Sequence, residues 1–238
     1  MASIDHAGSD GRLRAALQAE SSSARLHSAL VAGTNPDPRF VEILVDHCAV
    51  EPDFFVRDML TWALTRHSSS QTIPRLLDEA RVGAPQARSQ ALHTLSKIGD
   101  PRGWSAISTA VLRDRNDEVA RSAWRAAVSL VPAGQQAELA EELCTQLGRG
   151  DRDMQRSLSR AIASLGDVAR PLLGEHAAHE DAGIRTHAIA TERLLHDPEE
   201  DFEFAIAEAK RVAALTNAPT LGGEDLNRGR GSRPLPWT

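Results

Sequence analysis

Apolar positions along this chain follow a helical spacing, and the same short pattern returns many times. In each copy an arginine is followed, three and seven positions later, by mainly apolar residues, such as Leu60 and Leu64 after Arg57. Residues at these offsets share one face of a helix, so each copy predicts a helix with one buried face. The arginines that mark the copies are Arg25, Arg57, Arg88, Arg121, Arg156 and Arg185.

The intervals between these arginines are regular. The shortest is 29 residues, from Arg156 to Arg185, and the longest is 35 residues, from Arg121 to Arg156. Repeats of roughly this length are typical of solenoids, in which each unit packs only against its neighbours. The pattern therefore predicts an all-α solenoid built from about six helix pairs.

A second amphipathic helix precedes each arginine-bearing helix. Proline stands near several of its expected starts, including Pro74, and proline suits the first turn of a helix. The residues four positions before the arginines, Ser21, Asp53, Asp117 and Asp181, are expected to cap the arginine-bearing helices. The first helices are expected at 10–20, 38–49, 71–82, 101–113, 133–148 and 168–179.

The two ends of the chain differ from this pattern. Residues 202–215 predict a last amphipathic helix whose Glu and Lys content suits a capping helix with a polar outer face. The segment 217–238 is rich in Gly and Pro without any period, and we expect it to be a disordered tail. Residues 1–9 are expected to be flexible, which leaves one solenoid domain at 10–216.

Composition and charge narrow the function classes. The chain is 41% hydrophobic, much of it alanine, which favours helices, and its formal net charge is −6. An acidic chain has no general attraction to nucleic acid or to an anionic membrane. We find no apolar run of about 18 residues and no signal-peptide pattern, so we expect a cytoplasmic protein with no membrane partner. Two cysteines, Cys48 and Cys144, are too few and too distant for a disulfide framework.

The helix pairs, their Asp-Pro boundaries and the D-x-x-V-R start at Asp53 resemble HEAT repeats. They are most similar to the short bacterial kind related to the HEAT-like repeats of phycobilin lyases, over roughly residues 10–215. The resemblance implies a right-handed superhelix with second helices lining a concave groove. It also implies an Asp and Arg ladder between neighbouring units. Read from the residues alone, the recurring arginines form either this structural ladder or an anion-binding stripe. The ladder residues would be Arg25, Arg57, Arg88, Arg121, Arg156 and Arg185.

Residues on the second helices that do not repeat are the candidates for binding. Offsets of one, four, five and eight from each arginine turn away from the stacking face. These positions carry hydroxyls, including Thr61, Ser89 and Ser122, and a few charged or aromatic side chains, which suit a polar or anionic partner. The predicted partner-binding groove consists of Asp58, Trp62, His93, Arg125, Arg160 and Arg193.

Several of these residues have a structural alternative. The Trp62 ring lines the groove or is wedged between repeats, and His93 is a ligand-facing or a hydrogen-bonded helix residue. Trp124 stands at a core offset and is expected to be buried. The tail residues form a linear motif or a solvated linker, and they are Arg228, Arg230, Arg233 and Trp237.

Signals for catalysis or metal binding are weak. His176 and His179 are one helical turn apart, but the sequence HAAHE matches no zinc-protease motif, and we see no P-loop or G-x-S-x-G. We therefore expect no enzymatic activity, no metal and no cofactor.

The leading hypothesis is a monomeric scaffold that binds another protein or a peptide in the groove. One alternative is nucleic-acid binding similar to the HEAT-like DNA-alkylation glycosylases, in which Asp58 and Trp62 would act together. The other is a lyase or chaperone for a tetrapyrrole, suggested by the repeat type alone.

Overall fold

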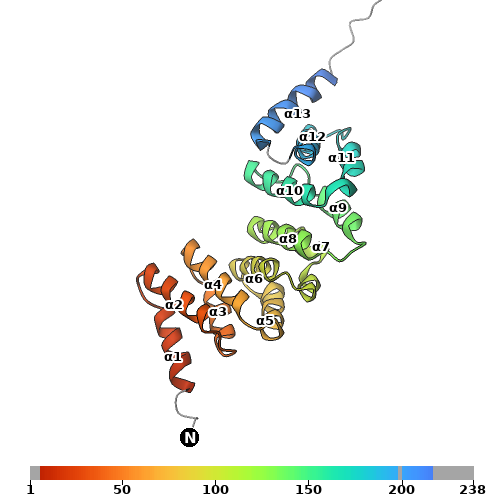
Figure 1. Ribbon diagram of the computed structural model, residues 1–238. Coiled ribbons are helices and arrows are strands. Elements are labelled where there is room, and N and C mark those ends of the chain that lie inside the picture. The colour runs from red at the N-terminus through yellow and green to blue at the C-terminus, as the bar shows by residue number, and fades with distance from the viewer. Residues whose placement is uncertain (1–5, 198–199, 217–238) are drawn as a thin grey trace, which may run out of the picture.

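The computed structural model describes residues 6–197 and 200–216, and within them every regular element is a helix. Successive helix pairs stack along one direction, from α1 at the bottom of Figure 1 to α13 at the top. The fold is an α-solenoid, as the sequence predicts. The predicted tail, 217–238, and the first five residues of the predicted flexible N-terminus lie outside the described residues.

The helices form two layers. First helices contact first helices of the next pair, as α3 contacts α5, and second helices contact second helices, as α6 contacts α8. In Figure 1 the second helices α4 to α12 lie to the left of their partners. The pairs are α1 (His6–Leu17) with α2 (Ser22–Thr34), α3 (Phe40–Cys48) with α4 (Phe54–Arg66), α5 (Ser69–Val82) with α6 (Pro85–Ile98), η1 (Pro101–Ala106) and α7 (Thr109–Leu112) with α8 (Asp117–Leu130), α9 (Gln136–Cys144) with α10 (Arg152–Ser164), and η2 (Gly166–Ala169) and α11 (Arg170–His176) with α12 (Ala182–His196).

Two of the first helices are broken where continuous helices were expected. In place of a helix at 101–113, the chain forms the 3-10 turn η1 and then α7, which Ser108 starts by accepting a hydrogen bond from Val111 N. In place of a helix at 168–179, Gly166 with φ of 71° opens η2, and α11 follows it. Pro74 also lies inside α5 and not in its first turn, because α5 begins at Ser69.

The helix caps agree only in part with the sequence pattern. Asp53 and Asp181 cap α4 and α12, each accepting bonds from two backbone N–H groups. Ser21 precedes α2 without a capping bond from its side chain. Asp117 is wrong as a cap, because it lies in the first turn of α8 and the side chain of Asn116 accepts the capping bonds.

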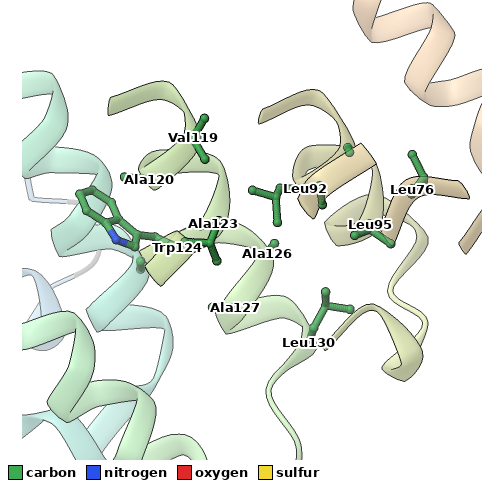
Figure 2. Packing of buried hydrophobic residues seen from close by; sticks show 14 of the residues in the cluster. Leu76, Leu92, Leu95, Val119, Ala120, Ala123, Trp124, Ala126, Ala127 and Leu130 are labelled. Atoms are coloured by element: carbon green, nitrogen blue, oxygen red, sulfur yellow. The ribbon is translucent and has the colours of Figure 1, made fainter. Parts of the chain in front are cut away.

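The main core is continuous from α1 to α12 and consists mainly of leucine and alanine. Figure 2 shows the middle of it, where small residues of α8 meet Leu92 and Leu95 of α6. Trp124 is fully buried, as its core offset predicts, and its Nε1 donates to Leu112 O at 2.9 Å. Burying the indole with its N–H satisfied stabilises the contact of α8 with α7, and removing such a ring typically costs about 3–5 kcal/mol.

The last helix, α13 (Phe202–Thr216), packs on α12 through a small cluster of its own. Phe202 and Ile206 are buried there, with Leu194 of α12. Phe204 is 55% exposed, so the exposed surface of α13 is less polar than the sequence suggested. Nowhere in residues 6–197 and 200–216 is there a helix with the length and apolar character needed to cross a membrane.

Candidate partner-binding groove

Neighbouring second helices are tied together by small hydroxyl side chains. Thr61 Oγ1 on α4 lies 3.3 Å from Thr94 Oγ1 on α6, and Ser89 Oγ on α6 lies 2.9 Å from Ser122 Oγ on α8. Thr61 and Ser122 are both only 2% exposed. The expectation that they would line an open groove is therefore corrected for Thr61: close helix packing turns its hydroxyl toward the next helix.

A hollow of about 420 Å³ opens beside this contact, across α4, α6 and α8. We call it the central hollow. It brings together three predicted groove residues, Asp58, His93 and Arg125, one from each helix. Its full lining is Phe54, Arg57 and Asp58 of α4, Pro85, Gln86, Ser89, Gln90 and His93 of α6, and Asn116, Glu118, Ser122 and Arg125 at the start and first turns of α8.

His93 stands in the middle helix of the three, between charges of opposite sign. Burial lowers the pKa of its imidazole to about 4; Arg125 and Lys97 lower it too, and Asp58 acts in the opposite direction. The ring is therefore neutral at physiological pH. It can donate or accept one hydrogen bond, but it cannot serve there as a cation.

Asp58 and Arg125 are available for a partner. Among the described residues, neither has an ion-pair partner. The Arg125 guanidinium makes one long side-chain hydrogen bond, 3.4 Å from its Nη2 to Ser122 Oγ. Burial and the nearby Arg121 lower the pKa of the Arg125 guanidinium. An opposite charge from a partner would offset that cost.

Phe54 is the residue that the sequence analysis missed. It lines the central hollow, is 65% exposed, and meets the 70% exposed Phe55 edge to face with ring centroids 5.6 Å apart. A signal was present in the sequence. The two phenylalanines follow the capping residue Asp53 directly, and consecutive helical positions cannot both face the core.

Trp62 does not line the central hollow. Its ring is 38% exposed and lies against Gly33 of α2, so closely that a Cβ at Gly33 would be 2.5 Å from Trp62 Cζ3. This contact is the wedge between repeats that the sequence left as an alternative. Asp58 and Trp62 are thus not gathered in one pocket.

Arg160 and Arg193 lie further along the stack, near the start of α13. Arg160 lines a separate hollow of about 800 Å³ with residues of α12 and α13. Arg193 is engaged within the molecule: its Nε and Nη2 donate to Glu200 at 3.0 and 2.5 Å, and its guanidinium lies 5.8 Å from the centre of the Phe204 ring. A partner would have to displace these contacts to reach it.

The six periodic arginines do not all make the same contacts. Three of them hold the turn before their own helix, because Nη1 donates to the carbonyls five and six positions earlier. Two pair with a carboxylate of the next helix pair: Arg25 with Glu51, and Arg88 with Asp114 at 2.6 Å. Those that hold the turn are Arg25, Arg57 and Arg185.

The remaining two arginines have weaker ties. Arg121 pairs within its own helix, with Glu118 at 3.3 Å. Arg156 reaches Glu203 of α13 at 3.4 Å and lies over the Phe202 ring. Each arginine of the series makes intramolecular contacts with different partners, which argues against one continuous anion-binding stripe along the stack.

Metal and thiol chemistry finds little support. No cluster of three or more metal-binding side chains occurs in the described part of the chain. The rings of His176 and His179 stack with centroids 6.3 Å apart. Both cysteines are buried and free, and burial raises their pKa to about 12 at Cys48 and about 11 at Cys144, so the thiols stay protonated.

Comparison with known proteins does not assign the chain to a family. No family model matches the chain, and no curated protein matches it. Among solved structures, the chain is similar to an engineered protein solved as a structural-genomics target, with 15% sequence identity and a TM-score of 0.42. The match covers 80% of this chain and 98% of that one. A likeness of this extent indicates no ligand, partner or reaction.

Proposed function

We propose that this protein is a non-enzymatic scaffold that binds a segment of another protein in the central hollow. The observation that carries the proposal is the pair of unpaired opposite charges, Asp58 and Arg125, on either side of the neutral His93. The exposed Phe54 ring at the same hollow adds an apolar anchor. Aromatic and arginine side chains in partly desolvated pockets carry much of the energy of protein interfaces.

Charge favours a protein partner over nucleic acid. The ionised side chains lining the central hollow are two positive, Arg57 and Arg125, and two negative, Asp58 and Glu118. Nucleic-acid surfaces need several phosphate contacts from a clearly basic stripe. The glycosylase-like alternative also loses its pairing of Asp58 with Trp62, since the tryptophan packs on Gly33 instead.

The helix pairs themselves are, in our proposal, HEAT-like repeats of a monomeric cytoplasmic protein. The order of first and second helices and the arginine contacts with the preceding turn support this. No family model matches the chain, so we propose the repeat type from the structure alone. It gives no evidence about function.

The test compares affinity capture from a lysate by the wild type, Phe54→Ala, Arg125→Gln and the control Arg66→Gln. Arg66 is an exposed arginine at the end of α4 that does not line the hollow. We expect one protein to be retained by the wild type and by the control. Its binding to either hollow variant should be weaker by about 2 kcal/mol or more if Phe54 and Arg125 are hot spots.

Nuclease treatment and melting curves complete the design. All variants should melt at the same temperature as the wild type, because Phe54 is 65% exposed and Arg125 makes one long side-chain hydrogen bond and no ion pair within the described residues. Retention of nucleic acid that nuclease abolishes would contradict the proposal, and so would equal capture of the same protein by all four chains.

A further inference from the structure

A second pocket lies at the C-terminal end of the stack, away from the central hollow. It is bounded by the first turns of α10 and α12 and by the last part of α13, and has a volume of about 720 Å³. We call it the C-terminal pocket. Its size is within the range of sites that bind small organic ligands.

The lining of the C-terminal pocket is positive on an acidic protein. Arg152, Arg185 and Lys210 line it, and none of them has a carboxylate at ion-pair distance among the described residues. The carboxylate in the lining, Asp151, already accepts a hydrogen bond from Met154 N at 2.9 Å. The pocket therefore carries an excess of two positive charges, against a net charge of −6 for the whole chain.

The arginines are positioned by neutral groups. Arg152 Nη1 donates to Gln155 Oε1 at 2.9 Å, and Arg185 Nη1 donates to His179 O at 2.6 Å. These bonds fix the direction of each guanidinium without neutralising it. A guanidinium held in this way keeps donors and full charge for an anion.

The start of α10 adds backbone donors. Its capping residue Asp151 accepts only from Met154 N, so the N–H groups of Arg152 and Asp153 have no intramolecular acceptor in the described structure. At α12, by contrast, Asp181 occupies the N–H groups of Gly183 and Ile184. The thirteen-residue helix α10 thus presents the positive end of its dipole beside the pocket.

An independent observation is the hydroxyl of Thr186. This threonine is 9% exposed and lines the C-terminal pocket, yet its hydroxyl makes no hydrogen bond within the described residues. The other deeply buried helical threonines all have hydrogen-bond partners. Thr72, Thr94 and Thr191 bond the carbonyl four positions earlier, and Thr61 bonds side chains of α6. The oxygen of Thr186 is not among the fully buried atoms that lack a partner, so it is open to the pocket and free to donate a hydrogen bond to a ligand there.

We propose that the C-terminal pocket binds the phosphate group of a small phosphorylated molecule. Arg152, Arg185 and Lys210 neutralise the group, which carries close to two negative charges at neutral pH, and Thr186 donates a hydrogen bond to it. The volume exceeds what a phosphate ion needs, so an organic group attached as a phosphate monoester fits the space better than the free ion. This site is independent of the protein partner proposed for the central hollow.

Isothermal titration calorimetry on the full chain tests the proposal with two probes, phenyl phosphate and inorganic phosphate, at constant ionic strength. We expect phenyl phosphate to bind the wild type and the control Arg66→Gln equally. The double variant Arg152→Gln/Lys210→Gln should bind at least about tenfold more weakly, since it loses two charge-assisted contacts. Equal binding of inorganic phosphate would identify the free ion as a sufficient ligand.

Thr186→Val separates a ligand contact from a structural role. Because the hydroxyl has no partner in the free protein, its replacement by a methyl group should leave the melting temperature unchanged or raise it, while weakening phosphate binding about tenfold. The proposal is overturned if neither probe binds, if the double variant binds as the wild type does, or if Thr186→Val loses stability but no affinity.

Discussion

Glu51 lies in the connection between α3 and α4 with only 1% of its surface exposed. Its carboxylate accepts bonds from Nε and Nη2 of Arg25, at 2.8 and 2.7 Å, and pairs with His47 Nε2 at 2.8 Å. Burial alone would raise its pKa, but these bonds and that of Asp53 N–H lower the pKa to about 2. The buried charge is stable only because all its partners are present.

The backbone of Glu51 also contacts the third helix pair. Its carbonyl accepts from Arg57 Nη1 and from Gln86 Nε2, both at 2.9 Å. One loop residue thus joins the first three pairs. The sequence could not indicate this role, because Glu51 belongs to no periodic position and its partner Arg25 is 26 residues away.

His187 is a buried residue whose charge state links stability to pH. Its Nδ1 accepts from Gly148 N at 2.9 Å, and its Nε2 lies 2.9 Å from Ser159 Oγ and 3.0 Å from Gln155 O. Burial lowers its pKa to about 4, against the bond with Gln155 and together with the nearby Arg152. A second proton would have to sit on Nδ1, facing the N–H of Gly148.

We therefore predict that His187 remains neutral in the folded protein far below its ordinary pKa. The unfolded chain takes up this proton near pH 6.5, whereas the folded chain does so near pH 4. The free energy of unfolding should therefore be highest above pH 6.5 and should fall by about 3 kcal/mol as the pH drops to about 4. An NMR titration of the histidine Cε1 protons checks this, and a midpoint near 6.5 for His187 would contradict it.

At the scale of elements, the contact of α2 with α4 depends on one glycine. A Cβ built on Gly33 would lie 2.8 Å from Ala63 Cα and even closer to the Trp62 ring, so the two helices approach more tightly than a side chain permits. The backbone of α4 cannot move without disturbing Leu60 and Leu64 in the core. The Trp62 ring covers this contact from outside.

We predict that Gly33→Ala destabilises the protein by about 1–3 kcal/mol through overpacking. The matched control is Gly174→Ala in α11, where a Cβ would meet nothing within 4 Å. That change should be neutral or stabilising by about 0.5–1 kcal/mol, because alanine favours the helix. Urea unfolding of both variants gives the comparison, and equal effects would show that the α2–α4 contact can relax.

How far the sequence predicted each element depended on its periodicity. Second helices such as α8 were located closely because every repeat carries the arginine and its apolar offsets. The broken first helices were not, since the break at Ser108 is a local capping event that leaves the apolar spacing intact. Helical direction alone was enough to place Asp58 and Arg125 away from the stacking face, and the two line one hollow, whereas packing against the next helix decided the position of Thr61 and buried it; that these residues bind a partner stays a prediction.

At the scale of the whole molecule, the two ends of the stack are not equivalent in their packing. The main core runs from Leu13 to Ala188, whereas Phe202 and its neighbours on α13 form a separate cluster with Ala190 and Leu194 of α12. In a solenoid, stability is approximately a sum of unit terms and nearest-neighbour interfaces. We therefore expect the interface of α12 with α13, the last helix of the stack (Figure 1), to open without the rest.

We predict that Phe202→Ala acts locally. Phe202 is 4% exposed and contacts the ring of His187 and the guanidinium of Arg156, so its loss should cost the α12–α13 interface about 3–5 kcal/mol. Hydrogen exchange should then accelerate in α13 and at the end of α12 while α4, α6 and α8 keep their protection, because nearest-neighbour coupling confines the opening. Trp124→Ala is the contrasting variant, since its ring lies within the main core and its loss should lower protection in α8 and the adjoining pairs. Equal acceleration along the whole chain in Phe202→Ala would mean that the stack unfolds as a single cooperative unit.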